Sequence, residues 1–139
     1  MLTRNATAKW EGGLKGGKGS FSTDTIHGNF SFLSRFGDGP GSTPEGLLGA
    51  AHASCFSMAL SAALEGAGAT GTTVETSSAV TADKLEAGFR ITGIKLVCKV
   101  TAGGLDKAKV LELAEATKTG CIVSRALSAV PMVLETVVG

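Results

Sequence analysis

Two cysteines in this chain of 139 residues, Cys55 and Cys121, have surroundings that could support redox chemistry. A cysteine attacks the O–O bond of a peroxide as a thiolate, and burial in apolar surroundings suppresses its ionisation unless a cation lies nearby. Cys55 lies in the middle of a predicted helix, too far from the helix N-terminus to use the helix dipole, so Arg35 is the plausible source of positive charge. Cys121 opens a short helical turn after Gly120, which is typical of a thiol with a low pKa. It could therefore capture the sulfenic acid that peroxide attack leaves on Cys55.

His52 allows two other chemistries, because it lies three residues before Cys55 on the same helix face. The pair supplies half of a zinc site, but the other candidate ligands are isolated along the chain. A Cys-His hydrolase needs a third residue that orients the imidazole, and none is evident. We therefore interpret His52 as a partly buried side chain that is hydrogen-bonded to backbone, and we predict no metal and no other cofactor. The isolated candidates are His27, Cys98 and Cys121.

Each candidate also has an interpretation without chemistry. Arg35 and Glu45 could form an ion pair at the surface, and Cys55 could be a small core residue. Cys98 shares the inward positions of a predicted strand with Ile94 and Leu96, so we assign it to the core.

The composition excludes several functional classes. Thirteen Lys and Arg nearly balance twelve Asp and Glu, and this balance gives no support to binding of nucleic acid or a membrane surface. No Gly-x-Gly-x-x-Gly motif stands between a strand and a helix, which argues against a dinucleotide site. The first nine residues contain no apolar run of a secretory signal, and three widely spaced cysteines do not make a disulfide framework. We expect a cytoplasmic protein with a single domain over residues 1–139.

The pattern before residue 44 predicts short strands joined by glycine turns, followed by a loop. Thr43, Pro44 and Glu45 then combine a hydroxyl cap, proline at the first helical position and an acid in the first turn. The predicted helix runs over residues 44–65. The predicted strands cover residues 6–10, 18–23 and, more weakly, 30–33, and the loop covers residues 37–43.

The middle of this helix, residues 47–64, contains no Asp, Glu, Lys or Arg. A transmembrane span has this length, but the segment carries His52 and small residues and lacks flanking basic anchors. We therefore predict a buried helix. One sheet covers only one of its faces, so a second subunit is the natural cover for the rest.

The remaining pattern predicts two more strands, a helix, a short helical turn and a closing strand. This order lacks regular strand–helix alternation, so we predict the α+β class with largely antiparallel pairing and a bulge or bend at Gly93. The predicted strands cover residues 73–81, 89–100 and 132–138, and the helices, the first capped by Asp106, cover 106–117 and 122–126.

Three segments resemble the OsmC/Ohr family of osmotically induced and organic-hydroperoxide-resistance proteins. They are Thr43-Pro-Glu-Gly-Leu-Leu-Gly-Ala-Ala-His-Ala-Ser-Cys55-Phe-Ser-Met-Ala-Leu60, Ser34-Arg35-Phe36 and Thr119-Gly-Cys121-Ile-Val-Ser124. The surroundings of Trp10 and residues 83–92 are also similar, so the resemblance covers essentially the whole chain. His52 and the context of Arg35 favour the OsmC branch. Gly46 departs from the pattern, since relatives often have an acid or an amide there.

The resemblance implies an intertwined homodimer with antiparallel sheets wrapped around long central helices. It implies a thiol peroxidase of oxidative or osmotic stress defence that prefers organic hydroperoxides to hydrogen peroxide and is reduced by dithiols, lipoyl groups among them. It also implies catalytic roles for four residues. Cys55 resembles the peroxidatic thiol, Cys121 the resolving thiol, Arg35 the guanidinium that stabilises the thiolate, and Glu45 the carboxylate that orients Arg35.

Glu45 and Cys55 stand ten residues apart on one predicted helix, which separates them by roughly 15 Å along its axis. A carboxylate at that distance is poorly placed to hold an arginine against Cys55 of its own chain. We therefore expect Glu45 to serve the active site of the partner subunit, with the two helices crossing antiparallel.

The competing function is a binding module of the same fold, with a small apolar ligand in the interface pocket and no turnover. Retention of Cys55, Cys121, Arg35 and Glu45 argues against it. A metal-dependent hydrolase is a more distant alternative.

Overall fold

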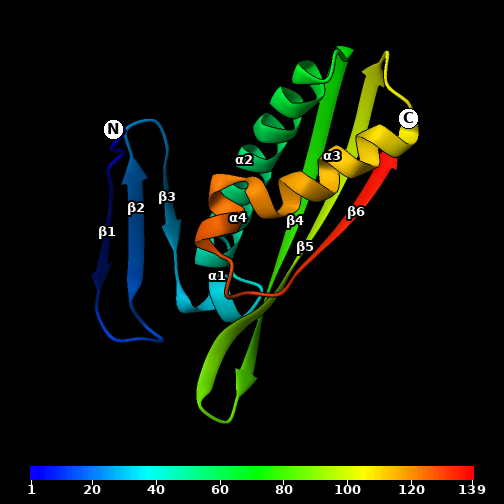
Figure 1. The fold of residues 1–139 in the computed structure, drawn as a ribbon. Coiled ribbons are helices and arrows are strands. Elements are labelled where there is room, and N and C mark those ends of the chain that lie inside the picture. Colours follow the sequence, from blue (N-terminus) through cyan, green and yellow to red (C-terminus); the bar gives the residue numbers. More distant parts are fainter. The chain divides into compact units, whose positions relative to one another are not determined.

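The computed structural model describes all 139 residues, which form two compact units. Unit 1 comprises Met1–Leu47 and unit 2 comprises Leu48–Gly139. Figure 1 labels the elements of both. The single domain over residues 1–139 stays a prediction.

Unit 1 is built on an antiparallel sheet of three short strands, β1 (Ala6–Glu11), β2 (Lys18–Thr23) and β3 (His27–Phe30). Gly19 and Gly28 each face an aromatic ring of the neighbouring strand, and the absence of a side chain leaves room for that ring to lie over the sheet. The Phe30 ring covers Gly19, where any Cβ would meet it at 2.4 Å, and Trp10 packs against the same ring with centroids 5.5 Å apart. Every residue of β1 is nevertheless exposed.

The predicted strand over residues 30–33 is wrong, because β3 ends at Phe30 and a short helix, α1 (Phe32–Phe36), begins two residues later. Ser31 and Ser34 form a capping box: the Ser31 hydroxyl accepts from the Ser34 N–H, and the Ser34 hydroxyl accepts from the Ser31 N–H. These two serines satisfy backbone donors that a strand would have used, so the local chemistry favours a helix over the apolar pattern.

Helix α2 (Pro44–Gly66) begins where the cap signals predicted, and the Thr43 hydroxyl accepts from the Gly46 N–H at 2.9 Å. By length and composition alone this helix could cross a membrane. In unit 2, however, one row of its side chains, at four-residue spacing, is fully buried: His52, Phe56, Leu60 and Leu64. The opposite side, which includes Met58, is open, as expected if a single chain covers only one face of the helix; its cover by a second subunit stays a prediction.

The sheet of unit 2 pairs two long strands, β4 (Thr70–Leu85) and β5 (Gly88–Gly103), in antiparallel fashion. The pairing shifts register where Thr81 faces Gly93 and Ala82 faces Ile91, which confirms the bulge predicted at Gly93. Beyond the bulge, alternate β5 residues point to one face and form the core: Ile94, Leu96, Cys98 and Val100. Cys98 is completely buried, as predicted.

The third strand, β6 (Met132–Val138), pairs with β5 in parallel, unlike the other strand pairs. Parallel neighbours require a crossover, and here it is helical. It contains α3 (Lys107–Gly120), capped by the Asp106 carboxylate on the Lys109 N–H, and the short helix α4 (Ile122–Ala126). In Figure 1, α3, coloured yellow to orange, runs across the sheet of unit 2; along the chain it follows β5 and precedes the red strand β6.

Helices α2 and α3 contribute to the same core as the inward face of β5. Phe56, Leu60 and Leu64 of α2 join Val110 and Ala114 of α3 in one buried cluster. At Gly49 helix α2 approaches β4 closely, since a Cβ there would lie 3.4 Å from the Ser78 carbonyl. The two sheets and their helices confirm the α+β class, with the parallel β5–β6 pair as the exception to the predicted antiparallel sheets.

Candidate active site

The structure brings the two predicted redox cysteines together within unit 2. Cys55, half-buried in the middle of α2, and Cys121, buried at the N-cap of α4, have Sγ atoms 3.0 Å apart. At this distance one thiol hydrogen bonds to the other. The sulfurs stand about 1 Å farther apart than in a disulfide bond of about 2.04 Å, so a small movement would join them.

The two thiols compete for one negative charge. Burial raises the pKa of Cys55, and the neighbouring Cys121 thiol raises it further. Burial also opposes ionisation of Cys121, but hydrogen bonds from the Cys55 thiol and from the Ser124 backbone and hydroxyl outweigh it and lower the pKa of Cys121. Within unit 2, the thiolate is therefore favoured on Cys121, and Cys55 lacks the positive charge that its predicted role requires.

The two predicted charged residues pair with each other in unit 1. The Arg35 guanidinium, in the last turn of α1, donates from both Nε and one terminal nitrogen to the Glu45 carboxylate, with the shortest distance 2.6 Å. Burial raises the pKa of Glu45, but the hydrogen bonds and charge of Arg35 outweigh it, so the pKa lies below its ordinary value. The carboxylate thus stays ionised at neutral pH and fixes the orientation of the guanidinium.

His52 does not match the sequence interpretation of a partly buried side chain bound to backbone. It is completely buried, and its Nε2 lies 2.7 Å from the hydroxyl of Ser124 on α4. Its Nδ1 is buried without a hydrogen-bond partner, and burial lowers the pKa of the imidazole. A neutral histidine that contacts a serine beside Cys121 therefore adjoins the thiol pair.

Sequence reasoning placed the four candidate residues in one site, and the structure resolves them into two pairs: the thiols in unit 2 and the ion pair in unit 1. It missed Ser124, although the position of Ser124 three residues after Cys121 could have indicated it. A residue three positions after a helix N-cap faces the cap side chain, as Ser124 faces Cys121.

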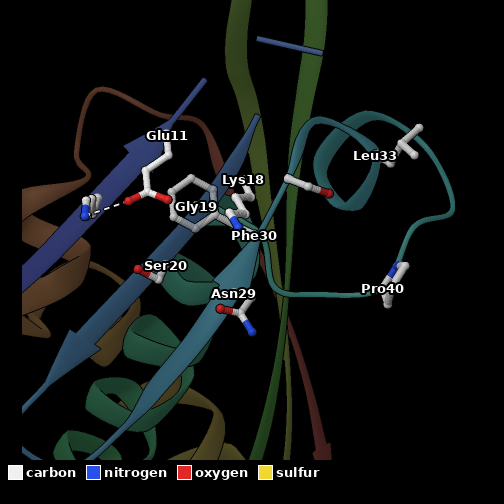
Figure 2. A pocket seen from close by; sticks show the side chains of 10 residues that line it. Glu11, Lys18, Gly19, Ser20, Asn29, Phe30, Leu33 and Pro40 are labelled. Atoms are coloured by element: carbon white, nitrogen blue, oxygen red, sulfur yellow. Dashed lines mark ion pairs between the residues drawn. The ribbon is translucent and has the colours of Figure 1, made fainter. Parts of the chain in front are cut away.

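No group of three or more His, Cys, Asp or Glu side chains is arranged to hold a metal ion. A hollow of about 650 Å³ in unit 1 lies along the strands and is drawn in Figure 2. Its rim includes the Lys9–Glu11 ion pair, the Phe30 ring and Leu33, but no cysteine or histidine. The hollow thus offers shape and some charge but no thiol for peroxide reduction.

Known proteins resemble this chain in sequence over most of its length. Residues 37–135 match the family model described as OsmC-like protein. The chain is 43% identical over 131 residues to the peroxiredoxin OsmC of Escherichia coli strain K12, covering 92% of each chain, and to that of Shigella flexneri to the same extent.

Solved structures share the fold. The organic hydroperoxide resistance protein OhrB of Bacillus subtilis superposes with a TM-score of 0.71 at 23% identity, over 99% of this chain and 98% of that one. An organic hydroperoxide resistance protein from Elizabethkingia anophelis gives a TM-score of 0.71 at 22% identity, over 100% and 98% of the two chains. With the family model and the 43% identity to peroxiredoxin OsmC, these findings establish that the chain belongs to the OsmC family.

Proposed function

We propose that this protein is a cysteine-based peroxidase that reduces organic hydroperoxides, and more weakly hydrogen peroxide, through a two-cysteine cycle. The observation that carries the proposal is the 3.0 Å separation of the Cys55 and Cys121 sulfurs. The names of the relatives, a peroxiredoxin and proteins of organic hydroperoxide resistance, support the reaction and the substrate class.

The cycle has two sulfur steps. The Cys55 thiolate attacks the terminal peroxide oxygen, an S–O bond forms as the O–O bond breaks, and the alkoxide leaves and takes a proton to become an alcohol. The Cys121 thiolate then attacks the sulfenic sulfur, and the S–S bond forms as hydroxide leaves and is protonated to water. A dithiol reductant, lipoyl groups among the candidates, restores both thiols by exchange.

Arg35 supplies what the thiol pair lacks. Burial and Cys121 raise the pKa of Cys55, so an external cation is needed to move the negative charge from Cys121 to Cys55. Arg35, oriented by the Glu45 carboxylate at 2.6 Å, is a suitable cation because its guanidinium stays charged. The 41% exposure of its side chain leaves donor groups free to approach a thiolate.

The active unit in this proposal is a homodimer. Ala51, Ser54, Met58 and Ala62 form an exposed, uncharged stripe on α2, beside the half-buried Cys55. A second copy that covers this stripe would bury it and bring apolar surface to Cys55. The ten-residue spacing of Glu45 and Cys55 along α2 supports delivery of Arg35 and Glu45 by the partner subunit. We place the protein in the cytoplasm as part of oxidative or osmotic stress defence.

The test is consumption of cumene hydroperoxide and of hydrogen peroxide with dithiothreitol, by the wild type and by Cys55→Ser, Cys121→Ser and Cys98→Ser. We expect Cys55→Ser to abolish turnover. Cys121→Ser should react once and then accumulate sulfinic acid on Cys55, as read by mass spectrometry. Cys98→Ser is the matched control, since the Cys98 thiol is fully buried, hydrogen bonds to Thr136 and has no part in the proposed cycle, so turnover should be kept.

Mixed dimers test the origin of the charged pair. In an equal mixture of Glu45→Ala and Cys55→Ser chains, about half of the dimers contain one chain of each kind. Each of these dimers should have one intact active site if the partner supplies Glu45. Activity independent of pairing would contradict the shared site. A slow loss of peroxide at the same rate in wild type, Cys55→Ser and Cys121→Ser would contradict the peroxidase proposal and favour a binding protein with the same fold.

A further inference from the structure

The core of unit 2 contains polar groups that the proposed cycle does not use. His52 is fully buried and Ser124 is 3% exposed, yet both are hydrogen-bonding side chains. The His52 Nε2 and the Ser124 Oγ lie 2.7 Å apart, on α2 and α4, and Ser124 stands three residues after Cys121. Each side chain would be costly to bury alone, and the hydrogen bond between them offsets part of that cost, so the pair forms a polar connection between α2 and α4 inside the core.

The direction of the hydrogen bond follows from the unpaired Nδ1 of His52. A neutral imidazole carries one N–H, and a buried N–H without an acceptor is rarer in proteins than an unused acceptor. The proton therefore belongs on Nε2, from which it is donated to the Ser124 oxygen. The Ser124 O–H is then free to donate elsewhere. Cys121 is the N-cap of α4, three residues before Ser124, so its sulfur lies on the side of the helix toward which such a donor is directed. The Ser124 hydroxyl also contributes to the lowered pKa of Cys121.

We propose that His52 and Ser124 form a hydrogen-bonded chain, from the His52 Nε2–H through the Ser124 hydroxyl to the Cys121 sulfur, that prepares Cys121 to resolve the sulfenic acid. This proposal rests on the peroxidase function, because it assigns Cys121 the resolving role. In this proposal the Ser124 hydroxyl is the group that donates to the reacting sulfur. His52 is a positioning residue, since it acts on the sulfur only through Ser124.

The chain serves the second sulfur step. While Cys55 is reduced, an external cation can hold the thiolate on Cys55, and Cys121 carries the proton. Once Cys55 is a sulfenic acid it no longer competes for the negative charge, and the Ser124 hydroxyl stabilises the Cys121 thiolate that attacks. A polarised hydroxyl is a better donor, so the bond from His52 strengthens the bond from Ser124.

The test measures Cys121 directly by peptide-resolved alkylation with iodoacetamide between pH 5 and 9, in full-length Cys55→Ser protein without peroxide. Ser124→Ala should lower the alkylation rate of Cys121 at neutral pH by roughly three- to tenfold and move its pH profile upward. His52→Asn should lower the rate by roughly two- to fivefold. His52→Gln should keep the rate of the parent, since its longer side chain can place an N–H where Nε2 stands.

Two controls separate the chain from general loss of structure. Ser128→Ala changes an exposed hydroxyl just after α4, so it should leave the profile unchanged. Cys98 is fully buried and should resist alkylation in every variant that keeps its core. Equal Cys121 profiles in the Asn and Gln variants, with Cys98 protected in both, would overturn the role of His52.

A molar excess of cumene hydroperoxide over Cys55 then separates this inference from the proposed function, because sulfinic acid forms only when a second peroxide molecule oxidises the sulfenic acid. In chains with Cys55 present, His52→Asn should accumulate more Cys55 sulfinic acid than His52→Gln. If alkylation behaves as expected but no variant forms a sulfenic acid or a disulfide, the hydrogen-bonded chain stands and the peroxidase proposal fails. If the disulfide forms equally fast in both variants, the hydrogen-bonded chain does not help Cys121 to attack the sulfenic acid on Cys55.

Discussion

The two units of this protein are stabilised in different ways. All ten fully buried apolar residues belong to unit 2, whereas the buried side chain of unit 1 is a serine, Ser34. Unit 2 thus has a hydrophobic core of its own, while unit 1 depends on local hydrogen bonds, capping and sheet pairing. Three short strands, of which β1 is exposed along its whole length, have little packing to stabilise them, so unit 1 should have the lower local stability.

The thiol pair and the ion pair are also held in place in different ways. The thiols are held by packing in unit 2, and the ion pair is held by hydrogen bonds in unit 1. Packed groups are fixed to within a fraction of an ångström, which disulfide formation requires. A long arginine side chain tolerates more movement, because a charge acts over several ångströms.

The largest expected effect is on the packing of unit 2. Leu60→Ala removes a fully buried side chain of α2 and should lower the free energy of unfolding by about 2–5 kcal/mol. Leu111→Ala makes the same change at a position that is 38% exposed and should cost less than about 1 kcal/mol. Urea denaturation followed by circular dichroism gives both values, and equal losses would contradict the assignment of Leu60 to a packed core and of Leu111 to its surface.

A smaller effect is expected in unit 1. Ser34→Ala removes a hydroxyl that accepts from the Ser31 N–H and donates to the Ser42 carbonyl, so the cost should be about 1–2 kcal/mol. The loss should appear as faster hydrogen exchange in residues 31–42, with unit 2 protected as before. Ser20→Ala, at an exposed position of β2, is the matched control and should leave exchange unchanged. Faster exchange throughout unit 2 would show that the two units are not stabilised independently.

The smallest effect is the pH dependence of the ion pair. The folded-state pKa of Glu45 is lowered, so its contribution is present above the unfolded pKa and disappears as pH falls through the folded pKa. The difference in unfolding free energy between wild type and Glu45→Gln should stay below about 1 kcal/mol at pH 7, because Arg35 is 41% exposed.

That difference should shrink as the pH falls below the ordinary carboxyl pKa of 4.5. Glu112→Gln is the control, since its carboxylate is 68% exposed beside Lys109. If the difference in unfolding free energy between wild type and Glu45→Gln increases as the pH falls, the pKa of Glu45 is not lowered in the folded protein.

Sequence patterns predicted most of unit 2 because its elements are long and their signals agree. The caps at Thr43 and Asp106 and the change of parity at Gly93 each stand in one short segment, and the structure has all three. Unit 1 was harder, since its strands have four to six residues and the serines of the capping box outweighed the apolar pattern over residues 30–33.

The cysteine pair could be predicted as a pair only through the family resemblance, because α2 and α4 meet by tertiary packing. The bond between His52 and Ser124, 72 residues apart, could not be predicted at all, since no local pattern links them. The parallel pairing of β6 was missed for a similar reason: a single helical crossover is a weak signal in an otherwise antiparallel order.

The 3.0 Å gap between the sulfurs has a kinetic consequence. Closure of the disulfide competes with arrival of a second peroxide molecule, and only the second event depends on peroxide concentration. With the partner sulfur already in contact, closure requires no loop opening or local unfolding, so the chemical step itself would set its rate. In the proposed cycle, the protein would therefore keep turning over at peroxide concentrations that inactivate an enzyme whose two thiols must first approach each other.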